Sequence, residues 1–312
     1  MGYSRFDPDS WTTYAASTAT KSRSAIFTKH GIDDSLDPKK FLMRESRDSI
    51  ANPLATPIII GVDVTGSMGM IAENLVKKGI GTAFSEILER AKDPKSGMVP
   101  DPQMMVIAIG DVACDRAPVQ VTQFETDLLI AKQTETIFLE GGGGGNNQES
   151  YDVAWYTAAM RTVTDAHEKR GKKGYLFTVG DEEIPVGLTK NNIQEYFGDE
   201  APENLSARQL LTMAEEKYHV FHVIVEQGSY ARQCGPENVK KIWQDLLGQR
   251  VLMLSDYDKL AEVIVSAIQV NEGTSITDVT ASWSGDTSLA VARAIGDLAK
   301  STSGVSSGIV RF

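Results

Sequence analysis

Short apolar runs alternate along the middle of this chain with longer segments whose apolar residues recur every three to five positions. The short runs are typical of β-strands buried on both faces, and the recurring spacing is typical of amphipathic helices. We expect strands at 57–62, 102–110, 119–124, 175–179, 220–225 and 250–254, and helices at 68–91, 126–138, 150–170, 206–216, 237–247 and 257–270. This alternation predicts an α/β fold with a doubly wound, mostly parallel sheet flanked by helices.

The two ends of the chain do not follow this alternation. Residues 1–54 are rich in Ser, Thr, Asp and Lys and show no sustained period, so we expect a polar N-terminal arm. Residues 55–272 would form the domain, and 273–312 a C-terminal extension with one short helix at 289–300. An arm of this length can become ordered on a partner or on another copy of the chain, which leaves self-association or incorporation in a larger complex open.

Composition and charge narrow the class of protein. The chain has 312 residues, of which 41% are hydrophobic and 23% are charged, as in ordinary globular proteins. Its net charge of -11 argues against nucleic acid or an anionic membrane as the main partner. No apolar run approaches the roughly 18 residues of a membrane span, and the N-terminus lacks the apolar core of a signal peptide. We therefore expect a cytoplasmic protein.

The candidate chemistry lies where the first predicted strand meets the first predicted helix. Asp63, Thr65 and Ser67 occupy alternate positions there, so their side chains should point the same way. The free amides of the helix would face the same place. One carboxylate and two hydroxyls suit Mg²⁺, which prefers oxygen ligands and retains several waters. We expect these residues to bind Mg²⁺, with Mn²⁺ or Ca²⁺ as alternatives.

The motif Asp63-x-Thr65-x-Ser67 resembles the metal-ion-dependent adhesion site of von Willebrand factor A domains, over roughly residues 55–272. In that family the second of the three positions is usually Ser, and Thr65 keeps the hydroxyl. The resemblance implies a Rossmann-like fold with a metal site at the carboxyl edge of the sheet. It also implies a coordination position left open, which an Asp or Glu of a partner protein fills.

The resemblance implies a further ligand from the glycine-rich segment 141–152. Glu149 matches the Glu of Asp-x-Pro-Glu loops, which binds the metal in some bacterial and integrin A domains. Asn147 and Gln148 replace the Asp and the Pro of that loop. Asn146 can instead be aligned with the commoner Gly-Gly-Thr type of loop, so its contribution stays open.

A third loop follows the predicted strand 175–179. Asp181 matches the family's Asp at the tip of this strand, but Gly180 displaces it by one position, which leaves Glu182 open as well. The paired Asp residues of the neighbouring calcium site of integrin β subunits are absent, because Met70 and Ile71 occupy their places. The resemblance therefore implies one metal ion.

Two other interpretations of the first motif are weaker. A helix cap explains one of its three residues. The run Thr65-Gly66-Ser67-Met68-Gly69 comes close to a nucleophile elbow, but Thr65 stands where that strained turn needs Gly, and the chain has few histidines.

The leading hypothesis is a metal-dependent protein-binding module without catalytic activity. The chain is similar to small stand-alone A-domain proteins of bacteria and tailed phages, so a virion is the alternative location if a phage encodes it. One alternative function is a Mg²⁺-dependent phosphohydrolase at the same edge, since Mg²⁺ held by carboxylates also serves phosphate chemistry. The other is a structural assembly protein with a vestigial metal site.

Overall fold

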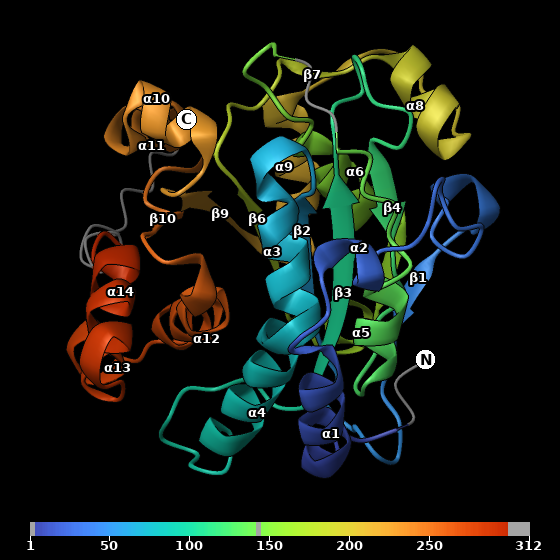
Figure 1. Ribbon diagram of the computed structural model, residues 1–312. Helices are drawn as coiled ribbons and strands as arrows, with labels where there is room; N and C mark the ends of the chain where they lie inside the picture. The colour runs from blue at the N-terminus through green and yellow to red at the C-terminus, as the bar shows by residue number, and fades with distance from the viewer. Residues whose placement is uncertain (1–3, 142–144, 299–312) are drawn as a thin grey trace, which may run out of the picture.

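The computed structural model describes residues 4–141 and 145–298, with the side chain of Ser67 outside the description. A six-stranded sheet lies at the centre in the order β10-β9-β6-β2-β3-β4 (Figure 1). Its strands are β2 (Thr56–Asp63), β3 (Pro102–Ile109), β4 (Val119–Val121), β6 (Gly174–Gly180), β9 (Tyr218–Val225) and β10 (Val251–Leu254). Edge strand β4 is antiparallel to β3, and the other neighbours pair in parallel. The predicted fold class is confirmed.

The central strand β2 is buried along its whole length, which explains its continuous apolar run. Successive side chains point to opposite faces of the sheet. Ile58, Ile60 and Val62 enter one hydrophobic cluster, and Ile59 enters the other. The sheet is therefore covered on both faces.

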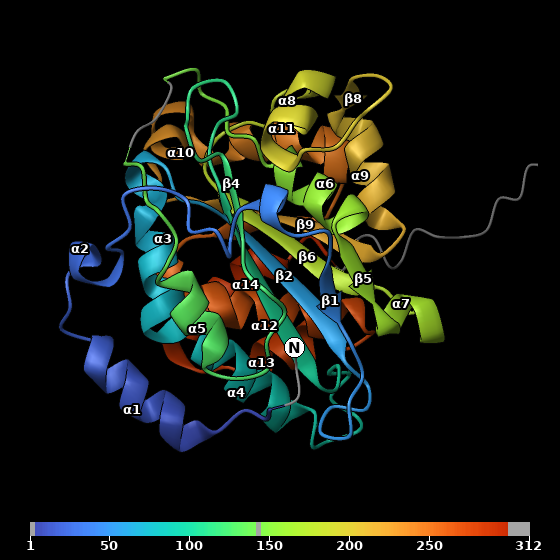
Figure 2. The same ribbon diagram turned by 90° about the vertical axis from the view of Figure 1, so that its right-hand side faces the viewer.

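Helices from different parts of the chain make the two covers (Figures 1 and 2). One face packs against α3 (Gly69–Asn74), α4 (Ile80–Arg90), α5 (Leu129–Thr134), α12 (Leu260–Asn271), α13 (Ile276–Ala281) and α14 (Gly285–Ile295). The other packs against α6 (Asp152–Met160), α8 (Lys190–Phe197), α9 (Ala207–Glu215), α10 (Ser229–Cys234) and α11 (Pro236–Leu247). Within the described residues, every helix is too short or too polar to cross a bilayer.

The prediction of a single helix at 150–170 was wrong. The structure has α6, then a short strand β5 (Thr162–Thr164), then α7 (Asp165–Arg170). Three consecutive β-branched residues at 162–164 favour extended backbone over helix. Thr164 then caps α7 by accepting a hydrogen bond from His167 N. Strand β5 pairs in parallel with β1 (Arg44–Ser46), which ties the N-terminal arm to the domain.

Helices α1 (Pro8–Thr18) and α2 (Arg23–Ile26) of the N-terminal arm lie along the outside of α3 and α4 (Figure 2). Trp11 of α1 is 6% exposed, and its ring centroid lies 6.2 Å from that of Phe84 in α4. At the other end of the chain, α14 covers residues 289–295 of the one helix expected at 289–300, and α13 is a further helix before it. Residues 299 and 300 of that expected helix lie outside the described residues.

Candidate metal centre at the carboxyl edge of the sheet

Two of the expected site residues follow neighbouring strands at the point where the strand order reverses. Asp63 ends β2, and Asp181 follows β6, which pairs with β2 in parallel. From β2 the chain first builds the sheet toward β3 and β4, and later toward β6, β9 and β10. Doubly wound sheets place ligand sites in the crevice outside the strand ends at this position.

Asp63 and Thr65 are held together by a tight turn. Asp63 is 1% exposed, and its Oδ1 accepts hydrogen bonds from Thr65 N and Thr65 Oγ1, both at 2.8 Å. An Asp that bonds the backbone two residues further on makes such a turn locally. Ser67 follows in the helical turn Gly66–Met68, but its side chain lies outside the description.

Glu149 reaches the same point from the glycine-rich loop. It is 1% exposed, and its Oε1 accepts a hydrogen bond from Thr65 Oγ1 at 2.7 Å. Asn147 supports the loop with a positive φ of 63°, a conformation that Asn tolerates well. Glu149 N donates to Glu183 O at 3.0 Å. The structure therefore brings Asp63, Thr65 and Glu149 together from segments more than 80 residues apart in sequence.

The donor set fits a hard cation. The Thr65 hydroxyl carries one hydrogen but lies within bonding distance of carboxylate oxygens of both Asp63 and Glu149. Among the described residues, Glu149 Oε2 is buried without a hydrogen-bond partner. Two such carboxyl groups around one hydroxyl need either a shared proton or a cation. In the described part of the chain no group of three His, Cys, Asp or Glu side chains could hold a metal, so a metal centre here would also need the Thr65 hydroxyl.

Asp181 lies close by but turns its carboxylate toward α10. Its Oδ2 accepts hydrogen bonds from Tyr230 N at 2.7 Å and from Ala231 N at 3.4 Å. This approach requires glycine at position 228, because a Cβ there would lie 2.3 Å from Asp181 Cγ. Asp181 therefore faces the site as a neighbouring charge, and its carboxylate is engaged by backbone amides.

The two residues left open by the sequence have other contacts. Asn146 donates a hydrogen bond to Asp111 Oδ2, in the loop after β3. Glu182 uses its backbone: its N–H donates to Tyr151 Oη at 3.3 Å, and its carbonyl accepts from Trp243 Nε1 at 3.0 Å.

Tyr151 is a residue of the site that the sequence did not reveal. It is fully buried, and its hydroxyl donates to Asp63 Oδ2 at 3.3 Å. A Cβ at position 180 would lie 2.0 Å from this hydroxyl, so Gly180 makes room for it. No sequence pattern links Tyr151 to a carboxylate 88 residues earlier.

Burial and mutual repulsion make these carboxyl groups resist ionisation. Burial raises the pKa of Asp63 well above its ordinary value, against the two Thr65 hydrogen bonds, and the charges of Asp181 and Glu182 raise it further. Burial and the Asp63 charge raise the pKa of Glu149 to about 10. Burial, then Asp181 and Asp111, raise the pKa of Glu182 to about 7. Within the described residues no Lys, Arg or His forms an ion pair with Asp63 or Glu149. A bound cation would invert this balance.

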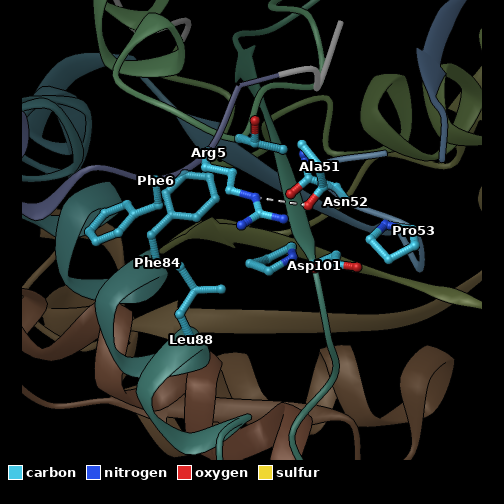
Figure 3. A pocket seen from close by; sticks show the side chains of 10 residues that line it. Arg5, Phe6, Ala51, Asn52, Pro53, Phe84, Leu88 and Asp101 are labelled. Atoms are coloured by element: carbon cyan, nitrogen blue, oxygen red, sulfur yellow. Dashed lines mark hydrogen bonds between the residues drawn. The ribbon is translucent and has the colours of Figure 1, made fainter. Parts of the chain in front are cut away.

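A cavity lies at the other end of the sheet. It has a volume of about 420 Å³ and is lined by Phe6, Phe84, Asp101 and Pro102, among others (Figure 3). Pro102 begins β3, whereas Asp63 ends β2. The Arg5 guanidinium at its rim already donates to Ala51 O at 3.2 Å. This cavity is therefore separate from the candidate metal centre.

No protein-family model and no curated protein matches the sequence. In structure, the chain is similar to the pilus adhesin SpaC from Lactobacillus rhamnosus GG in its open conformation, with 9% identity and a TM-score of 0.41 over 74% of this chain and 30% of the adhesin. It is also similar to proximal thread matrix protein 1 from the mussel byssus, with 14% identity and a TM-score of 0.43 over 69% of this chain and 47% of that protein. Another structure of the byssus protein, with a zinc-occupied MIDAS motif, has 13% identity and a TM-score of 0.38 over 70% and 46%. This chain spans less than half the length of each. The strand order and parallel register, rather than these similarities, define the fold.

Proposed function

We propose that this protein is a metal-dependent protein-binding module of the von Willebrand factor A type. Asp63, Thr65, Ser67 and Glu149 would hold one Mg²⁺, with Asp181 contributing through a water molecule, and the ion would offer an open position to an Asp or Glu of a partner protein. The observation that carries the proposal is the Thr65 hydroxyl between two buried carboxyl groups, one of which keeps an oxygen without a described partner.

The chemistry of these residues supports Mg²⁺ and a binding role. Hydroxyl and carboxylate oxygens are hard ligands, and the described residues add no sulfur or imidazole contact to Asp63 or Glu149. The carboxylates of Asp63 and Glu149 would balance the charge of the ion, while neutral hydroxyls leave it able to attract a further anion. Because a partner carboxylate can bind to the ion without any covalent bond being broken, we propose a binding role without catalytic activity.

Calorimetric titration with Mg²⁺ or Mn²⁺ tests the metal centre. We expect one ion to bind per wild-type chain, and no binding to Asp63→Ala. Asp93→Ala is the matched control, because Asp93 is exposed in the loop between α4 and β3 at the opposite edge of the sheet. At free Mg²⁺ of 100 times Kd, the wild type should gain about 2.7 kcal/mol of unfolding free energy.

Equal binding by wild type and Asp63→Ala, or no binding by either, contradicts the proposal. Metal-dependent hydrolysis of a phosphate ester by the wild type would favour the phosphohydrolase instead.

A further inference from the structure

The loops at the carboxyl edge carry far more acidic than basic residues. Segments 63–68, 110–118, 140–150 and 181–186 contain eight acidic residues and one basic residue, Arg116. The Arg116 side chain is 75% exposed and is already paired with Glu140 at 2.7 Å. A divalent ion would offset two negative charges, so the edge stays strongly negative with the metal bound.

These acidic residues belong to one continuous surface, because hydrogen bonds join three of the loops. Glu149 N donates to Glu183 O at 3.0 Å, and Glu183 N donates to Asn147 O at 3.3 Å. Val112 N, in the loop after β3, donates to Ser150 Oγ at 3.0 Å. The side chains of the acidic rim, defined here as Asp115, Glu182 and Glu183, are partly exposed around the buried Glu149.

The charges of this rim act on the centre. Glu182 N donates to Tyr151 Oη at 3.3 Å, and this hydroxyl donates to Asp63 Oδ2 at 3.3 Å, so Glu182 lies beside the centre. Glu149 is 1% exposed, and its Oε2 has no partner among the described residues, so this oxygen is available to a bound ion. A partner carboxylate that approaches this point is attracted by the ion and repelled by the rim.

Whether this attraction or this repulsion dominates depends on the charges that flank the partner carboxylate. Charges within the Debye length of about 8 Å at physiological salt still interact strongly. A segment with several acidic residues would therefore be repelled, whereas basic residues beside one carboxylate would meet the rim with opposite charge.

Building on the proposed function, we infer that the partner presents a single Asp or Glu flanked by Lys or Arg. The flanking cations would lie over Asp115 and Glu183. They would set which partners bind, while the central carboxylate supplies the bond to the ion.

Three peptides of equal length test this inference on the full chain saturated with Mg²⁺. Each has one central Glu, flanked on both sides by Lys, by Ser or by Asp, and each is titrated to millimolar concentration by calorimetry. At low salt, we expect the Lys-flanked peptide to bind about ten-fold more tightly than the Ser-flanked one, and the Asp-flanked one to bind most weakly. A central Glu→Gln change in the Lys-flanked peptide should abolish the metal-dependent part of binding.

The double variant Asp115→Asn/Glu183→Gln removes two rim charges but keeps the oxygens that accept bonds from Asp111 N and Tyr230 Oη. In this variant, the affinities of the Lys-flanked and Ser-flanked peptides should differ by less than three-fold. Glu89→Gln/Asp93→Asn makes the same change in net charge on exposed residues at the opposite edge and should keep the gap.

The outcomes separate the two claims. Equal metal-dependent binding of the Lys- and Ser-flanked peptides overturns the inference and leaves the metal-dependent module standing. An unchanged gap in the rim variant also overturns it. Binding of no peptide by chains shown to hold Mg²⁺ contradicts both the inference and the partner-carboxylate part of the proposed function.

Discussion

The Tyr151 hydroxyl links the candidate centre to the core. It donates to Asp63 Oδ2 and accepts from Glu182 N, while its ring packs edge-on against His222 and Trp243, with centroids 5.0 and 5.3 Å away. Two aromatic neighbours therefore fix the ring that orients the carboxylate. Partners that orient a ligand in this way typically tune metal affinity.

Tyr151→Phe removes this hydroxyl and keeps the packing of the ring. We expect Mg²⁺ affinity to fall about ten-fold, because Asp63 loses the group that orients it. Tyr156→Phe is the matched control, since its hydroxyl bonds Asp199 in the loop after α8. Calorimetry on both variants measures the effect; equal losses of affinity would show that Tyr151 has no special role.

The buried carboxyl group of Asp152 should make the stability of the protein depend on pH. It is fully buried at the start of α6, and no hydrogen bond of normal geometry reaches its carboxylate among the described residues. Burial raises its pKa from 3.8 to about 7, although the nearby amides of Asp152 and Val153 act in the opposite direction. Because the pKa of Asp152 is higher in the folded chain than in the unfolded one, the stability that this residue contributes is fully present below its unfolded pKa. That contribution is lost as the pH rises to its folded pKa.

The unfolding free energy of the wild type, relative to Asp152→Asn, should therefore fall between pH 4 and 7 by up to about 1.4 kcal/mol per pH unit. Above pH 7 the difference should level off. Urea unfolding of both proteins in chelator, at steps of one pH unit, measures it. A constant difference across this range would mean that Asp152 does not hold a proton in the folded chain.

At the scale of elements, periodicity identified long segments and missed short ones. Strand β2 and helix α4 were predicted correctly because their buried residues form a continuous apolar run in β2 and recur every three to four positions in α4. Helix α1 was missed, since its buried residues are few and lie among polar ones. Its capping by Asp7, which accepts bonds from Asp9 N and Ser10 N, was the local signal available in the sequence.

Trp11→Ala tests whether α1 is part of the stable fold. Trp11 packs on Phe84 and close to Gly81, where a Cβ would lie 2.8 Å from the indole. Removing a buried Trp side chain should lower the unfolding free energy by about 3 kcal/mol, and trypsin should then cut faster at Lys21 and Arg23. Trp11→Phe should retain most of the stability. Unchanged urea unfolding of the Ala variant would show that the arm contributes little.

At the scale of the whole molecule, the alternation of strands and helices was enough to predict the doubly wound sheet. It also predicted the edge at which Asp63, Glu149 and Asp181 lie, because carboxyl ends of parallel strands meet there. The pairing of Asp63 with Thr65 is local and could be foreseen. The contacts of Tyr151 and the turn of Asp181 toward α10 depend on side chains from distant segments, which periodicity does not describe.

The backbone at position 228 also limits how this protein can change over generations. Asp181 already fills the space in which any larger residue at 228 would place its Cβ. A side chain at 228 therefore requires that Asp181 shift or be exchanged for a smaller residue, and such an exchange removes a charge from the carboxyl edge. While Asp181 keeps its present position, only glycine fits at 228 without a clash, so the two positions constrain each other's variation.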